Sequence, residues 1–381
     1  MPASMRCTDH LRTRSVAALL LLLLLPAIAW AHKASDSYLT IGPLRDGEAT
    51  LRWDIALRDL ELALALDADD DRRLRWGELR PRLPEIVAHA GAALQINRGE
   101  CPLALRALGI EPRSDGNYLA LGARLRCPGG ALRSIDYRLL GALDPTHRGL
   151  LRIERADGEI AAWSLDPNGE TRALAAAGGA GVASFFGDGL AHILIGYDHL
   201  LFLLCLMLPA LLRREAAGWR PVASAREALV PLLKTITLFT LAHSVTLALA
   251  SFEIVHLPAR WVEAAIAISI VLAALHNLWP RRPGGEPALA FGFGLVHGFG
   301  FANVLAGMSL PPTDFALALL GFNLGVEAGQ LLVVAIATML LLALARYRRI
   351  ARVLMPAASF AAIGIGGLWA IERLFEVALV S

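Results

Sequence analysis

Six apolar segments after residue 180 constrain the fold of this chain more than any other feature. A helix needs about 20 predominantly apolar residues to cross a bilayer, and each segment reaches that length. The segments are 187–212, 229–252, 261–279, 288–309, 313–345 and 353–374. With 56% hydrophobic and 18% charged residues, the 381-residue chain is also too apolar for an ordinary soluble protein. We therefore expect residues 181–381 to form an all-α membrane bundle of six helices.

The first 31 residues have the pattern of a secretory signal peptide. Basic residues up to Arg14 precede an apolar run, and Ala29-Trp30-Ala31 fits a small-x-small cleavage site. Cleavage there would make His32 the first mature residue. Its α-amine and imidazole could together chelate a metal ion, although any residue can follow a signal.

Basic residues in the predicted loops indicate which side of the membrane each loop occupies. They cluster after the first, third and fifth segments, and basic loops remain in the cytoplasm. These residues are Arg213, Arg214, Arg220, Arg226, Arg281, Arg282, Arg346, Arg348, Arg349 and Arg352. The pattern predicts an inner-membrane protein with a periplasmic N-terminal domain. A formal net charge of +2 argues against a nucleic-acid partner.

Residues 32–180 predict an exported, β-rich domain with a helical insertion. Short alternating runs bounded by Gly, Pro, Asp or Asn indicate antiparallel strands. These runs are 38–41, 50–55, 118–127, 135–140 and 149–153. Helical spacing at 57–66 and 79–94 indicates two helices between the strands. Cys101 and Cys127 lie in this exported part, where a disulfide is favoured over a metal site.

The loop between those two helices resembles a degenerate EF-hand. Asp67, Asp69, Asp71 and Glu78 occupy positions 1, 3, 5 and 12 of a calcium loop. Arg72 stands where the turn calls for Gly, and neighbouring arginines repel a cation. Two interpretations remain open, a calcium site and an acidic loop that keeps only the EF-hand shape.

Polar side chains inside the apolar segments are the main indication of function, because burying them in hydrocarbon is unfavourable. Six of the ten histidines lie after residue 180. We expect a metal-binding cluster formed by His192, Asp198, His199, His243, His297 and Glu327. A second set would support the cluster or act as hydrogen-bonding contacts between helices. It comprises Asp188, Ser244, Asn303, Asn323 and Gln330.

Spacing and depth favour the cluster over isolated packing contacts. On a straight helix, Asp188, His192 and His199 would share one face. Asn323, Glu327 and Gln330 would share a face of the fifth helix in the same way. His199, His243, His297 and Glu327 lie about 13–20 Å from the ends of their segments, near the middle of a core about 30 Å thick.

The segment from His192 to His199 resembles the HPxxGxDH motif of the HupE/UreJ family of hydrogenase and urease accessory proteins. His192, Gly196, Asp198 and His199 occupy the motif's main positions. The family's second motif, FHGxAHGxE, is kept only at His297 and Gly298, because Phe301 and Val304 replace its second His and its Glu. The resemblance covers about 185–375 and implies a nickel permease-like protein, in a form extended by an exported domain that begins at His32.

Three functions are compatible with these residues. Imidazole and carboxylate ligands suit nickel, cobalt or zinc, so a permease for a divalent transition metal is the first hypothesis. An intramembrane metal-dependent hydrolase is the alternative, although the sequence contains no HExxH or GxSxG motif. The third interpretation makes the exported domain the functional module and the membrane half its anchor. The sequence specifies no protein partner.

Overall fold

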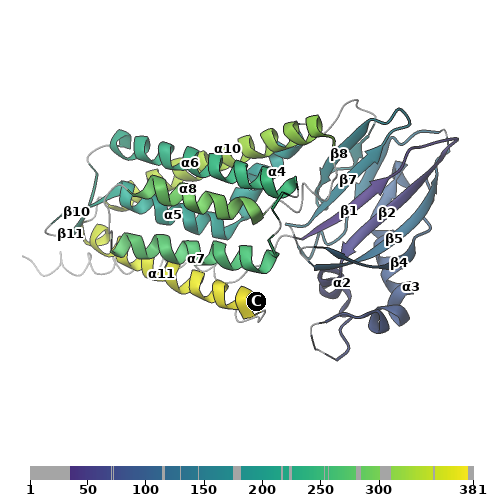
Figure 1. Ribbon diagram of the computed structural model, residues 1–381, viewed down its shortest axis with the longest axis horizontal. Helices are drawn as coiled ribbons and strands as arrows, with labels where there is room; N and C mark the ends of the chain where they lie inside the picture. The colour runs from purple at the N-terminus through teal and green to yellow at the C-terminus, as the bar shows by residue number, and fades with distance from the viewer. Residues whose placement is uncertain are drawn as a thin grey trace, which may run out of the picture.

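The computed structural model describes residues 35–375 apart from short gaps. The gaps are 70, 72, 114–115, 129, 145, 175–181, 216–217, 223–224, 253, 256, 280–284, 301–309 and 346–347. The predicted signal peptide, His32 and Asn303 lie outside the described residues. A β-rich N-terminal half is followed by a helical half, as the sequence predicts (Figure 1).

A six-stranded sheet is the framework of the N-terminal half, in the order β4-β5-β2-β1-β7-β8. Its strands are β1 (Asp36–Ile41), β2 (Glu48–Ala56), β4 (Arg106–Arg113), β5 (Gly116–Arg126), β7 (Arg148–Glu154) and β8 (Ile160–Leu165). The expectation of antiparallel pairing throughout is wrong at one place, because β1 pairs with β7 in parallel. A parallel pair needs a long crossover connection, and residues 42–147 provide it.

The crossover contains the predicted helical insertion. Helices α2 (Leu57–Leu64) and α3 (Trp76–Ala92) lie between β2 and a small sheet in the order β3-β6-β9. The small sheet comprises β3 (Leu94–Ile96), β6 (Ser134–Tyr137) and β9 (Arg172–Ala173). The residues around the insertion form one buried apolar core with the large sheet.

Both faces of the large sheet are covered, because successive side chains of a strand point to opposite faces. On β1, Leu39 packs into the core shared with α2 and α3. Its neighbour Tyr38 belongs instead to a buried cluster with Phe185, Leu247 and Phe322 of the helical half. The sheet therefore packs directly against the ends of the membrane helices (Figure 1).

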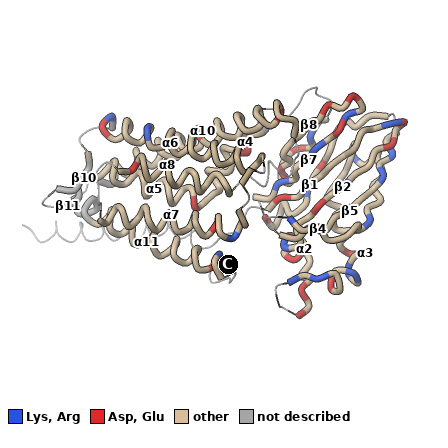
Figure 2. The backbone as a smooth tube through the Cα atoms, viewed as in Figure 1, with Lys and Arg blue, Asp and Glu red and all other residues tan. Residues whose placement is uncertain are grey.

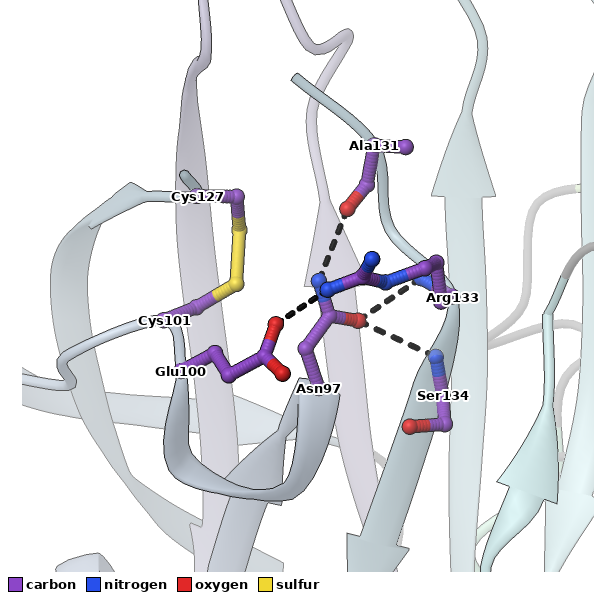
Figure 3. The surroundings of a disulfide bond; sticks show 7 residues. All are labelled: Asn97, Glu100, Cys101, Cys127, Ala131, Arg133 and Ser134. Atoms are coloured by element: carbon purple, nitrogen blue, oxygen red, sulfur yellow. Dashed lines mark hydrogen bonds and ion pairs between the residues drawn. A yellow bond between two sulfur atoms is a disulfide. The ribbon is translucent and has the colours of Figure 1, made fainter. Parts of the chain in front are cut away.

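The predicted disulfide joins Cys101 to Cys127 across 26 residues (Figure 3). Beside it, the buried Asn97 side chain organises the neighbouring turn. Its Oδ1 accepts hydrogen bonds from the backbone N–H groups of Arg133 (2.7 Å) and Ser134 (3.1 Å). Its Nδ2 donates to the carbonyl of Ala131 (2.8 Å). The turn is thus fixed by one covalent link and three hydrogen bonds. Cys205, by contrast, is a buried free thiol, as expected.

The helical half contains seven helices in the part of the chain that the structure describes. They are α4 (Val182–Ile195), α5 (Tyr197–Leu211), α6 (Ala225–Ser251), α7 (Ala259–Leu278), α8 (Glu286–His297), α10 (Pro312–Ala345) and α11 (Arg348–Phe375). Charged residues gather on the N-terminal half and are sparse on these helices (Figure 2).

Four of these helices are long and apolar enough to cross a membrane, namely α6, α7, α10 and α11. Helices α4 and α5 make a fifth span if the bent pair is counted as one. The fourth predicted segment, 288–309, is seen only as α8 of 12 residues and a short 3-10 turn at Gly298–Gly300. Its remainder lies outside the described residues, so the six-span expectation is only partly met.

A buried polar network lies in the core of the N-terminal domain. Both ring nitrogens of His147 are hydrogen-bonded, Nδ1 to the Ser35 hydroxyl and Nε2 to the Tyr137 hydroxyl. The carboxylate of Asp59 lies 3.8 Å from His147 Nδ1. Burial lowers the pKa of His147 from 6.5 to about 3 and raises the pKa of Asp59 from 3.8 to about 6. His147 is therefore neutral above about pH 3 and Asp59 below about pH 6, so both groups are neutral between these two pH values.

This network predicts two opposing effects of acid on stability. Because the folded pKa of His147 is depressed, its contribution is complete above pH 6.5 and is lost as the pH falls towards 3. Because the folded pKa of Asp59 is raised, its contribution is complete below pH 3.8 and is lost as the pH rises through 6. We expect the N-terminal domain of His147→Gln to gain stability as the pH falls from 6.5 to 4, because only the Asp59 effect remains. The same domain of Asp59→Asn should lose stability over this range, because only the His147 effect remains. Calorimetric melting of the full chain at both pH values measures this. A change of stability in the same direction in both variants would contradict it.

Candidate metal centre

The centre is built around a break in the first membrane helix pair. Helices α4 and α5 meet at Gly196 with a bend of 69°. The expectation of a straight helix carrying Asp188, His192 and His199 on one face is therefore wrong. On a straight helix, His192 and His199 would be about 10 Å apart along the axis. The break instead brings their ring centroids to 4.6 Å.

Gly196 is required at the break because there is no room for a side chain. A Cβ at this position would lie 2.5 Å from the carbonyl oxygen of His192 and 3.1 Å from His199 Nδ1. The Gly196 N–H donates to that His192 carbonyl at 3.0 Å, and the Gly196 carbonyl accepts from Leu200 N–H at 3.0 Å. Gly196 thus joins the end of α4 to the start of α5, with His192 on one side of it and His199 on the other.

Three imidazoles from three helices converge at this break. One ligand nitrogen from each of His192 (α4), His199 (α5) and His243 (α6) lies within 4.8 Å of the others. A closed tetrahedral zinc site, with Zn–N bonds of about 2.0–2.1 Å, needs nitrogens about 3.4 Å apart. The three nitrogens are therefore close enough for small side-chain rotations to bring them onto one ion.

His297 at the end of α8 adds a fourth imidazole. Its ring centroid lies 4.9 Å from that of His199. The hydroxyl of Ser269 (α7) donates to the carbonyl of Ile266 at 2.6 Å, so its oxygen must accept from His297 Nε2 at 3.0 Å. This assignment leaves the lone pair of His297 on Nδ1, which has no hydrogen-bond partner among the described residues. Ser269 thereby orients His297 as a potential ligand.

Asp198 orients His199 in the same manner. Its Oδ1 accepts hydrogen bonds from His199 Nδ1 (3.0 Å) and from the His199 backbone N–H (2.8 Å). The proton of His199 therefore lies on Nδ1, and its Nε2 lone pair is available for an ion. A carboxylate behind a ligating imidazole is a recurrent feature of metal sites. Asp198 also lies in the first turn of α5, where its charge balances the positive end of the helix dipole.

Aromatic side chains enclose the imidazoles. Phe202 and Phe239 lie 5.1 and 5.3 Å from the His297 ring, and Phe322 lies 5.4 Å from the His192 ring. A small cavity beside His199 is lined mainly by apolar side chains, with Gln330 as its other polar residue. Water is thus largely excluded, which strengthens any interaction between the imidazoles and a cation.

Glycines allow the helices that carry the cluster to approach closely. A Cβ at Gly298, directly after α8, would lie 2.3 Å from the His243 carbonyl on α6, and a Cβ at Gly294 on α8 would lie 2.5 Å from the Phe239 carbonyl. Such small residues are typical of packed membrane helices. The backbones of α6 and α8 are therefore in direct contact at the level of the cluster.

Several predicted residues lie elsewhere. Glu327 is half-buried on α10 and is not among the described side chains whose ligand atoms converge at the cluster. Asp188 lies on α4, one turn before His192, and its side chain faces Ser164 of the N-terminal domain. Asn323, by contrast, lies beside the cluster: its side chain faces the His243 imidazole and also donates to the Leu319 carbonyl of its own helix.

Two others make packing contacts. Gln330 accepts a hydrogen bond from Thr240 at 3.0 Å, and Ser244 donates to the Thr240 carbonyl at 2.7 Å. Ser269 was missed in the sequence, where a single hydroxyl in an apolar segment carries no distinctive signal.

The EF-hand-like loop brings its acids together but already neutralises them. Carboxylate oxygens of Asp67, Asp69 and Asp71 lie within 4.8 Å of one another. The guanidinium of Arg75 lies 2.5 Å from Asp71 and 3.7 Å from Asp69. Glu78, the expected twelfth ligand, accepts the Arg75 backbone N–H at 2.9 Å. A calcium ion would therefore have to displace an arginine.

The fold and the cluster together define a polytopic membrane protein with an intramembrane histidine centre. A family model described as HupE / UreJ protein matches residues 169–373, which is more than half of the chain. The chain belongs to the HupE/UreJ family, and the residues before 169 are an N-terminal extension of the matched part. A comparison with curated proteins gives no match.

The geometry at the break makes Gly196→Ala a direct test of the centre. The added methyl group has to push the His192 carbonyl or the His199 ring away, so we expect the affinity for Co²⁺ or Ni²⁺ to fall about 10-fold or more. Equilibrium dialysis of the purified full chain measures this. Gly187→Ala is the matched control, because a Cβ there meets no atom within 4 Å among the described residues. Equal affinities for the two variants would show that the break does not shape the site.

Proposed function

We propose that this protein is a membrane permease for a divalent transition metal, nickel or alternatively cobalt or zinc. The observation that carries the proposal is the convergence of three imidazoles within 4.8 Å, with a fourth beside them, inside an apolar bundle. Imidazole nitrogen prefers such borderline ions, whereas magnesium and calcium prefer oxygen ligands. His199 Nε2 and His297 Nδ1 are buried and have no hydrogen-bond partner among the described residues, and burying such nitrogens is unfavourable unless a ligand uses them.

The position of the cluster favours transport. Discontinuous helices with a binding site at the break are typical of secondary transporters. Here α4 and α5 form such a broken span, with His192 and His199 on its two sides. The end of α4 also presents the negative end of its dipole to the site, which favours a cation.

The proposed topology follows from the sequence. Cleavage after residue 31 would export residues 32–180 to the periplasm, and six spans would place the basic loops in the cytoplasm of an inner-membrane protein. Glu327 would then lie on the translocation path near the cluster without belonging to it. His32 would be a candidate to capture metal outside the membrane.

No observation favours the alternative hydrolase. A metal-dependent hydrolase needs a carboxylate or another base that can reach the metal-bound water. Among the described residues, the carboxylate at the cluster is Asp198, and its Oδ1 is held by His199. One tightly retained zinc ion per chain, with hydrolytic activity, would instead support the enzyme.

Transport in reconstituted vesicles tests the proposal. With a metal-sensitive dye inside, we expect wild-type protein to admit Ni²⁺ or Co²⁺, and His199→Ala, His243→Ala or Asp198→Asn to reduce the initial rate about 10-fold or more. His89→Ala is the control, because it removes an imidazole from α3 in the exported domain. Unchanged rates in the cluster variants would contradict the assigned roles.

The exported loop is proposed as a weak calcium site limited by Arg75. We expect Arg75→Ala to strengthen calcium binding about 10-fold, because the guanidinium no longer competes for Asp71 and Asp69. Calorimetric titration of the full chain measures the affinity, with Arg80→Ala as an exposed arginine control. If wild type and both variants release or absorb no heat on calcium addition, the loop is only an acidic surface.

A further inference from the structure

A second imidazole–carboxylate pair lies between α7 and α8, away from the histidine cluster. His276 Nε2 is 3.9 Å from Glu286 Oε1. His276 belongs to the last turn of α7 and Glu286 to the first turn of α8. The two side chains are 16% and 23% exposed, so the pair is mostly buried but can be reached.

The spacing of this pair is too long for a hydrogen bond and suits two ligands of one ion. A hydrogen bond between nitrogen and oxygen spans about 2.7–3.2 Å. Two donors that are each about 2.0–2.2 Å from a metal lie about 3–4 Å apart. His276 Nε2 is buried and has no hydrogen-bond partner among the described residues. A bound cation would satisfy both groups.

Helices α7 and α8, which carry His276 and Glu286, also extend to the level of the histidine cluster. Ser269 on α7 meets His297 on α8 at one level of the bundle, and His276 is two turns further along α7, about 10 Å away. Helix α8 runs parallel to α6, whose end packs on the exported sheet. The pair of His276 and Glu286 therefore lies on the side of the cluster away from the sheet.

The end of α7 is also held in place. Asn277 donates from Nδ2 to the Cys205 carbonyl of α5 at 2.8 Å, next to His276 in the chain. This contact ties the last turn of α7 to the helix that carries His199. The position of His276 relative to the cluster is thus fixed by packing, as a defined site requires.

We propose that His276 and Glu286 form a second, weaker site for the same class of divalent transition metal, at which the ion rests after leaving the histidine cluster. Two protein ligands, with water completing the shell, hold an ion more loosely than three or four imidazoles do. Conduction requires such sites, from which the ion can depart. The role in transport rests on the proposed function, whereas the binding site itself does not.

Cobalt titration of the full chain in lipid nanodiscs tests the site, with the visible absorption of Co²⁺ as the readout. We expect two phases in wild type, a tight one from the cluster and a weaker one from His276 and Glu286. His276→Ala or Glu286→Gln should remove the weaker phase, or weaken it about 10-fold or more, and leave the tight phase unchanged. His89→Ala should leave both phases unchanged.

The double variant His199→Ala/His243→Ala isolates the second site. It should lose the tight phase and keep the weaker one, and adding His276→Ala should abolish binding. Should the double variant fail to fold, the wild-type and single-variant titrations carry the test. A weaker phase that is absent from wild type, or that persists in both His276→Ala and Glu286→Gln, would overturn the proposal. Loss of the tight phase from wild type would instead overturn the proposed function, so the two failures are distinguishable.

Discussion

The break at Gly196 is the feature on which the rest of the membrane site depends. A continuous helix would keep His192 and His199 on different turns, about 10 Å apart. Ending α4 and restarting with α5 at a 69° angle brings their rings together. It also places Asp198 in the first turn of α5, where it fixes the tautomer of His199. The close contact of α6 with α8 through Gly294 and Gly298 then brings His243 and His297 to the same place.

The N-terminal domain is coupled to this break through the large sheet. Tyr38 of β1 belongs to the same buried cluster as Phe185 and Ile193 of α4. Ile193 is adjacent to His192, and Phe322 of that cluster contacts the His192 ring. The orientation of α4, and with it one ligand of the centre, is therefore set partly by packing against the sheet. The N-terminal domain is therefore part of the packing around the metal centre and is not attached to the helices by the chain alone.

The sequence predicts the chemistry of the site better than its geometry. Ionisable groups are rare in apolar segments, so the pattern singles out the histidines and Asp198, and the structure brings four of the imidazoles together. Helical periodicity assumes a straight helix, so it wrongly places His199 on one continuous face with Asp188 and His192, which lie on α4 before the break. It also could not reveal Ser269, because the role of that hydroxyl depends on a contact between α7 and α8. In the N-terminal domain, local alternation locates the strands and helical spacing locates the helices, but the parallel pairing of β1 with β7 is a long-range property that no local pattern contains.

The central claim is that the imidazoles at the break bind a transition metal together. X-ray absorption spectroscopy of the purified chain loaded with one equivalent of Ni²⁺ or Zn²⁺ tests this most directly. The account predicts at least three imidazole nitrogens in the first shell, at about 2.0–2.1 Å for zinc, and the loss of one of them in His243→Ala. A shell of oxygen ligands, or a spectrum that His243→Ala leaves unchanged, would contradict it.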